Sequence, residues 1–226
     1  MKRPKLNDRQ ATILGFNFLI VIGEFLGIAL RVSILGALGL EYYTIISNLL
    51  SLVASALVVY FLFRTNKIPH WVAVLRLIAT TMLAITFIFV LFVLPINMHV
   101  PLWQLLFPGQ MFFLHFACPV LAIVAMLSAE QYKFLKRDRK VVAIPTLAYA
   151  VIIIALNSLD IVNGPYPFIR QLLAGQFTGV LAAFAMCYLV PVLIASAFYG
   201  VQGYRIKKLN LKTKKKEATR DGLHRA

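Results

Sequence analysis

The 226-residue chain is 61% apolar and only 14% charged, whereas soluble domains are usually about 45–50% apolar and about 25% charged. This composition excludes a soluble globular protein, and it excludes disorder everywhere except near the ends. A disulfide scaffold is also excluded, because Cys118 and Cys187 are the two cysteines and both lie inside apolar runs. The net charge of +15 would suit nucleic acid, but the positions of the charges favour a membrane. The sequence therefore predicts an integral membrane protein.

Six apolar segments approach or exceed the length that a membrane helix needs, which is about 20 residues. They are Thr12–Leu30, Tyr43–Phe63, Trp71–Leu94, Gly109–Ser128, Val141–Leu156 and Phe177–Tyr199. Prolines in the short connections act as breaker signals between these segments. We predict an all-α polytopic membrane protein with six transmembrane helices in one bundle (residues 1–204), followed by a basic cytoplasmic tail (residues 205–226).

Lysine and arginine gather at the N-terminus, in the second and fourth connections and in the tail. Cytoplasmic segments of membrane proteins carry the excess of positive charge, so we predict that both termini are cytoplasmic, in a cell (inner or plasma) membrane. The first span carries Glu24 and has no convincing cleavage site, so we expect it to be retained and not removed as a signal peptide. The basic tail is expected to touch anionic lipid headgroups, and no nucleic-acid partner is predicted.

Polar side chains inside a bilayer cost free energy and often mark function. A stripe about 100° wide on one face of the second span carries Thr44, Ser47, Asn48, Ser51 and Ser55. Small hydroxyl residues also permit close helix packing and bond to neighbouring backbone, and we favour that interpretation for Ser51 and Ser55. For Thr44, Ser47 and Asn48, near the predicted outer surface, packing and function are equal alternatives.

His115 is the one histidine inside a predicted span, and helix rise puts it in the same outer third of the bilayer as Thr44. On its face of the fourth span follow Cys118 and three alanines, a seam of small residues that suits a tight helix contact. His115 is therefore expected to point towards the bundle. The alternatives are a neutral imidazole satisfied by a neighbour and a side chain that reaches the outer headgroups.

Glu24 is the one acidic residue in the middle of a predicted span. A carboxylate at that depth needs a proton, a cation or hydrogen-bond donors, and Glu24 could orient His115 or bond Asn48. Asp160 and Tyr166 belong to the outer fifth connection, which could fold back as a lid. On the inner side, Arg76 is more simply interpreted as an anchor that snorkels to the interface.

A hydroxyl becomes a nucleophile when a base removes its proton, and histidine is the usual base near neutral pH. Thr44, or Ser47 one turn on, could form such a pair with His115, and Asn48 or a nearby amide could donate to a developing oxyanion. Glu24, one intramembrane histidine and two distant cysteines show no recognised metal-ligand spacing. No phosphate loop, haem motif or dinucleotide fingerprint is present. Neither a metal nor a cofactor is therefore predicted.

Three short runs carry a family resemblance: Tyr-Thr-Ile-Ile-Ser-Asn-Leu-Leu at 43–50, Leu-His-Phe-Ala-Cys-Pro at 114–119 and Gly-Pro-Tyr-Pro-Phe at 164–168. They resemble a bacterial group of six-span membrane proteins that is similar to the eukaryotic androgen-induced and androgen-dependent membrane proteins. The eukaryotic members are intramembrane threonine hydrolases that act on fatty acid esters of hydroxy fatty acids. The resemblance implies that Thr44 is the catalytic threonine and His115 the catalytic histidine. The chain between these two residues is shorter than in the animal proteins.

The leading hypothesis is an intramembrane hydrolase or acyl transferase that acts on a lipid ester in the outer half of the bilayer. Thr44 would attack the acyl carbonyl, with His115 as base and then acid, and the substrate would enter laterally from the lipid. A non-catalytic lipid-binding or membrane-assembly protein is one alternative, and a small-solute or ion transporter is another. A transporter would more naturally carry polar groups near the midplane and an inverted repeat, and neither is evident in the sequence.

Overall fold

The computed structural model describes residues 6–36, 41–162 and 177–223, and this part of the chain is helical without strands. Six stretches are long and apolar enough to cross a membrane. They are α1 (Asp8–Leu35), α2 (Tyr43–Thr65), α3 (His70–Phe92), the fourth helix formed by η2 (Phe112–Ala117), α6 (Cys118–Val124) and η3 (Ala125–Ala129), the fifth formed by α7 (Asp138–Val141) and α8 (Ala143–Ser158), and Ala183–Leu211 within α10 (Phe177–Leu223). The predicted all-α, six-span, multi-pass membrane protein is confirmed.

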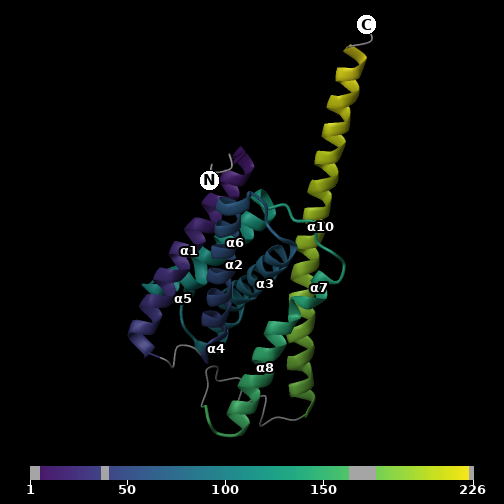
Figure 1. The fold of residues 1–226 in the computed structure, drawn as a ribbon. Coiled ribbons are helices and arrows are strands. Elements are labelled where there is room, and N and C mark those ends of the chain that lie inside the picture. Colours follow the sequence, from purple (N-terminus) through teal and green to yellow (C-terminus); the bar gives the residue numbers. More distant parts are fainter. Residues whose placement is uncertain (1–5, 37–40, 163–176, 224–226) are drawn as a thin grey trace.

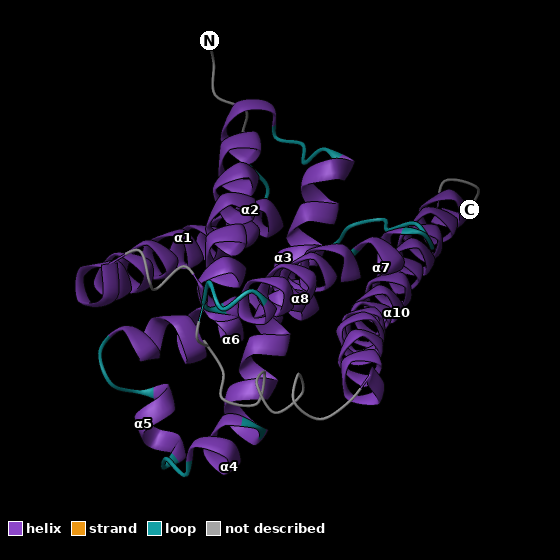
Figure 2. Cartoon of the chain, turned by 90° about the horizontal axis from the view of Figure 1, so that it is seen from below, coloured by secondary structure: helices purple, strands orange, loops and turns teal. Residues whose placement is uncertain are grey.

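The helices form a bundle with an attached pair. α1, α2, α3 and the fourth helix pack on one another, while α8 and α10 pack together (Figures 1 and 2). α10 contacts the bundle at α3 and η3, and α8 contacts it at α2 through the Thr146–Tyr43 hydrogen bond. The start of α1 and the end of α10 lie towards the same end of the molecule (Figure 1), as an even number of spans requires. We call this the terminal end of the bundle, and the opposite end the cavity end.

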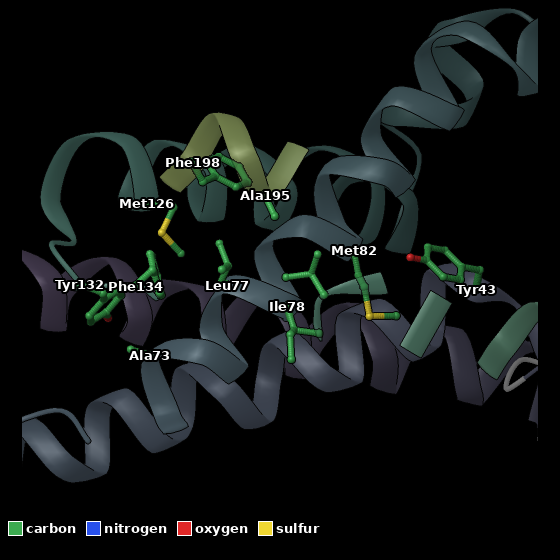
Figure 3. Packing of buried hydrophobic residues seen from close by; sticks show 11 residues of the cluster. Tyr43, Ala73, Leu77, Ile78, Met82, Met126, Tyr132, Phe134, Ala195 and Phe198 are labelled. Carbon is green, nitrogen blue, oxygen red and sulfur yellow. The ribbon is translucent and has the colours of Figure 1, made fainter. Parts of the chain in front are cut away.

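Apolar side chains of α3 form the centre of the main hydrophobic core. Leu77, Ile78 and Met82 of α3 pack with Ala195 and Phe198 of α10 in a cluster that continues to Tyr43 of α2 (Figure 3). Between helices in a bilayer, close van der Waals packing of such side chains favours association. The contact joins the bundle to the α8–α10 pair, which is distant in sequence. This cluster holds α10 against α3.

Most helix ends differ from their predicted positions, among them the start of α1 and the end of α10. α1 begins at Asp8, four residues before the predicted start, because Asn7 and Gln10 form a reciprocal capping box in which the Asn7 side chain accepts from the Gln10 N–H at 2.9 Å. α10 continues without a break across residue 204 to Leu223. The predicted division between the membrane domain and the tail is therefore not a break in secondary structure.

The connection between the third and fourth spans contains two short helices that the sequence did not predict. They are α4 (Leu94–Met98) and α5 (Leu102–Leu106). The prolines interpreted as breakers lie where they start these helices: Pro95 is in the first turn of α4, and Pro101 is the N-cap of α5. Proline is tolerated there because the first turn of a helix leaves its N–H groups unpaired. Leu94, Leu105 and Leu106 then pack on Val90 of α3.

α1 approaches the fourth helix closely at two glycines spaced four residues apart. A Cβ atom on Gly23 would lie 2.7 Å from Cys118 Sγ, and one on Gly27 would lie 2.9 Å from Phe113 Cβ. Small residues with this spacing let helix backbones approach in membranes. The predicted seam on the fourth helix therefore has its partner on α1, at the level of the candidate site.

Candidate active site

A cavity of about 270 Å³ lies at the cavity end of the bundle. The end of α1, the start of α2, both short helices and η2 enclose it, and it is lined by Arg31, Tyr42, Thr44, Ile45, Leu94, Met98, Leu105, Met111, Leu114 and His115. Its inner wall is buried, whereas Met98 at the rim is exposed and Arg31 and Thr44 are partly exposed. Mostly apolar lining with a few convergent polar groups is typical of a small-molecule site.

Thr44 and His115 line this same cavity from different helices. Helix α2 begins at Tyr43, so its first turn holds Thr44 at the cavity end. His115 belongs to the π-helical segment η2. Pro119 has no N–H with which to bond the His115 carbonyl four residues earlier, so an ordinary α-helical ladder cannot continue through this turn. π-helical turns are frequent at functional sites.

The hydrogen bond of His115 determines which ring nitrogen is free. Its Nδ1 lies 2.7 Å from the Leu105 carbonyl oxygen, and a carbonyl can only accept, so Nδ1 carries the proton. In the neutral imidazole the other nitrogen, Nε2, is then an acceptor. α5 thus sets the tautomer in which His115 can act as a base.

The Thr44 hydroxyl makes no hydrogen bond with any residue that the structure describes, His115 included. Its backbone carbonyl, in contrast, accepts from Ser47 Oγ at 2.9 Å and from Asn48 Nδ2 at 2.6 Å. The backbone at Thr44 is therefore held by two neighbours while its hydroxyl stays available. Catalytic hydrogen bonds are often made only in the substrate complex.

Asn48 joins the two helices that carry Thr44 and His115. Its Nδ2 group donates to the Thr44 carbonyl and also, at 3.3 Å, to the Leu114 carbonyl. Both amide hydrogens are therefore used, which leaves none for the oxyanion role that the sequence suggested. The structure instead gives Asn48 a positioning role between α2 and η2.

Ser47 is a buried bridge between α2 and α3. Its Oγ lies 3.0 Å from Thr86 Oγ1 and donates to the Thr44 carbonyl. Ser47 is not among the residues that line the cavity. The packing interpretation of this hydroxyl is the one that its contacts favour.

Arg31 and Tyr42 are two cavity residues that the sequence reasoning did not assign to the site. The Arg31 guanidinium carbon lies 4.8 Å from the centroid of the Tyr42 ring, which is a cation–π distance. Arg31 brings a positive charge to the cavity beside Thr44 and His115. The signal for Arg31 in the sequence was its place at the end of an otherwise apolar span.

Glu24 and Asp160, two further predicted site residues, do not line the cavity. Glu24 is fully buried deeper in the bundle, where Ser51 and Arg76 face it. Asp160 is exposed just after α8, with a positive φ of 55°. Tyr166 lies outside the described residues, so its predicted place in a lid is not described either.

A second polar cluster is buried towards the terminal end. Arg76 Nε lies 3.1 Å from Glu130 Oε1, and the Asn17 amide donates to the same oxygen at 3.0 Å. Arg76 and Glu130 are both 0% exposed, so the expectation that Arg76 snorkels to the interface is wrong. A counter-ion from a residue 54 positions away keeps the guanidinium inside.

The connection after η3 covers this cluster with the buried side chain of Tyr132. Burial, and after it the negative charge of Glu130, raises the pKa of the Tyr132 phenol well above its ordinary value, so that this hydroxyl stays neutral. Arg205 of α10 donates to the carbonyls of Leu127, Ser128 and Glu130. Basic side chains commonly satisfy the unpaired carbonyls at a helix end. Arg205 therefore caps η3, although it is the first residue of the predicted tail.

Comparison with known proteins identifies no relative of the chain. No family model, no curated protein and no solved structure matches the chain. The interpretation of the cavity therefore depends on its own residues and on the short motifs described above.

Proposed function

We propose that the protein is an intramembrane hydrolase, or a related acyl transferase, that acts on lipid esters. The proposal is supported by one observation above the others: Thr44 and His115 line one apolar cavity, and the bond to Leu105 leaves His115 Nε2 as a free acceptor. The resemblance of the motifs around both residues to intramembrane threonine hydrolases points the same way. On the predicted topology, the cavity opens towards the outer leaflet.

The chemistry follows from these two groups. Thr44 Oγ attacks the ester carbonyl as His115 Nε2 takes its proton, and the protonated imidazole then gives that proton to the leaving alcohol. A water molecule, or a second alcohol in acyl transfer, gives a proton to Nε2 and attacks the acyl-threonine. Release of the acid, or of the new ester, returns the proton to Thr44. No other proton carrier is needed.

The cavity volume limits how the substrate lies. About 270 Å³ is just below the range of about 300–1,000 Å³ that is usual for sites that enclose drug-sized ligands. It accommodates an ester group and part of an acyl chain. The rest of a fatty chain would lie among the lipid-facing helices, so lateral entry from the bilayer suits this site.

A fluorophosphonate probe tests the proposal directly, since it forms a covalent bond with an activated hydroxyl. We expect labelling of the wild-type protein in membranes and loss of labelling in both Thr44→Ala and His115→Ala. Ser47→Ala is the matched control, because its hydroxyl lies one turn away outside the cavity. Asn48 still bonds the Thr44 carbonyl in this variant, so it should label like the wild type. Labelling that persists in both site variants would remove these residues from the proposed roles.

Arg31 is expected to favour substrates that carry a negative charge beside the ester. A charge-assisted hydrogen bond contributes about 1.5–3 kcal/mol, so Arg31→Gln should lower kcat/KM for a carboxylate-bearing ester at least about tenfold. Hydrolysis of a neutral ester of the same chain length should change little. Arg64→Gln, an exposed arginine on the far end of α2, is the control. Equal losses for the charged and the neutral ester would contradict this role.

A further inference from the structure

Three ionisable side chains from different parts of the chain meet in the sealed interior of the bundle. Glu24 of α1, Arg76 of α3 and Glu130 after η3 are all 0% exposed. Arg76 bonds Glu130 through Nε, while its two terminal nitrogens have no hydrogen-bond partner in the described part of the chain. Arg76 is also near enough to Glu24 for its charge to act on that carboxyl group. One guanidinium thus acts on two buried carboxyl groups, although it bonds only Glu130.

The charges of this group do not balance if both acids are ionised. Arginine keeps its proton in proteins, so one guanidinium faces two carboxyls and one negative charge is left over. The other groups that face Glu24 are Ser51 of α2 and Cys118 of α6, and Tyr132 beside Glu130 is neutral. None of these supplies a second positive charge. Arg205 and Arg9 also lie near Glu130, but they donate to the backbone carbonyls of Glu130 and Ala129. Within the described residues, neither arginine forms an ion pair with Glu24 or with the Glu130 carboxylate. An uncompensated charge in a low-dielectric interior is costly enough that the group normally takes a proton.

The hydrogen bonds distinguish the two carboxyls. Glu130 Oε1 accepts from both Arg76 and Asn17, which favours its ionised form. Neither oxygen of Glu24 has a hydrogen-bond partner among the described side chains, and Ser51 Oγ beside it has none either. We propose that the core is a proton-binding site, in which Glu24 holds one exchangeable proton while Arg76 neutralises Glu130.

The site has a polar connection to the cavity end. Ser51 lies one helical turn below Asn48 and Ser47, on the same face of α2. Asn48 is bonded to the Thr44 carbonyl, and its Oδ1 has no partner within the described residues. Polar groups on one face of α2 thus lie between the surroundings of Thr44 and Glu24, although no hydrogen bond joins Asn48, Ser51 and Glu24 to one another among the described residues. The proposal takes this face as the route by which the proton exchanges. The inference does not depend on hydrolase activity.

Infrared spectroscopy of the whole chain in vesicles of ether-linked lipid, which has no ester carbonyl, tests this directly, because a protonated carboxyl has a C=O stretching band that a carboxylate lacks. We expect this band at neutral pH in the wild type, with an isotope shift in D₂O that shows exchange. Glu24→Gln should lose the band and keep the fold, because an amide is close in shape to the protonated acid. Asp138→Asn is the matched control, since Asp138 is also buried but bonds the Leu135 N–H and His70.

If Arg76 can neutralise only one of the two carboxyl groups, two further predictions follow for the same band. In Glu130→Gln, Glu24 becomes the counter-ion of Arg76, so the band should disappear although Glu24 is still present. In Arg76→Gln, both acids must be neutral, so the band should double in intensity. Should either variant fail to fold, the comparison of the wild type with Glu24→Gln still decides.

A band that survives Glu24→Gln would place the proton elsewhere and overturn the proposal. Absence of the band in the wild type would overturn it as well, because Glu24 would then be ionised. If the band appeared only after sodium was replaced by choline, the site would hold an alkali cation and not a proton. An unchanged band in Glu130→Gln would show that Glu24 and Glu130 do not share Arg76.

Discussion

Hydrolysis of a lipid ester should stop in Thr44→Ala, because Thr44 supplies the one aliphatic hydroxyl among the described residues that line the cavity. His115→Ala should lower kcat by about 10²–10⁴-fold, the contribution that general acid–base catalysis usually makes. Thr44→Ser keeps a hydroxyl on the same carbon and should retain measurable turnover. The measurement is release of fatty acid from a defined ester by purified protein in vesicles.

The same variants distinguish catalysis from a packing role. Thr44 is only partly buried and its hydroxyl bonds no described residue, so Thr44→Ala should keep the unfolding temperature in detergent. We expect the reverse pattern for Ser47→Ala. It removes the hydrogen bond to Thr86 between α2 and α3, so it should lower stability while leaving hydrolysis largely intact. If Thr44→Ala lost stability and no activity were found in the wild type, the non-catalytic alternative would be the better explanation.

The spans were predictable because apolar length alone decides which segments can cross a bilayer. The start of α2 was predicted at Tyr43, where the structure also begins it. Helix periodicity grouped Thr44, Ser47 and Asn48 on one face, and the structure turns this face towards the fourth helix and α3. Local patterns of this kind are properties of a single helix, so they can be read before any contact is known.

Contacts between distant elements were not predictable in the same way. The Arg76–Glu130 pair joins α3 to a residue that the sequence placed in a connection. A lone arginine near the end of a span is interpreted as an anchor unless its partner is known. Leu105 orients His115 through its backbone carbonyl, and a pattern of side chains does not reveal a backbone contact. The close approach of α1, however, had a signal in the spacing of Gly23 and Gly27.

Substitution of Glu130 by leucine is expected to lower the free energy of unfolding by about 3 kcal/mol. Removing one partner of a buried ion pair leaves an uncompensated charge and costs about 3–5 kcal/mol. The guanidinium of Arg76 cannot neutralise itself, and the Asn17 amide loses its acceptor as well. We expect the lower end of this range because Glu24 can supply one negative charge. The measurement is the unfolding midpoint in detergent, with Asp8→Asn, an exposed acid of α1, as the control.

Removal of both charges should restore most of this loss. In Arg76→Met/Glu130→Leu no charge is left unpaired, and replacing a buried pair by apolar residues of similar volume is often neutral or stabilising by about 1–4 kcal/mol. A double variant less stable than either single variant would show that Arg76 and Glu130 act on the fold through other contacts. The infrared band gives a second readout: the double variant keeps one acid and no guanidinium, so Glu24 should remain protonated. The band should therefore be lost in Glu130→Gln and return to wild-type intensity in the double variant, a pattern that follows from charge balance and not from stability.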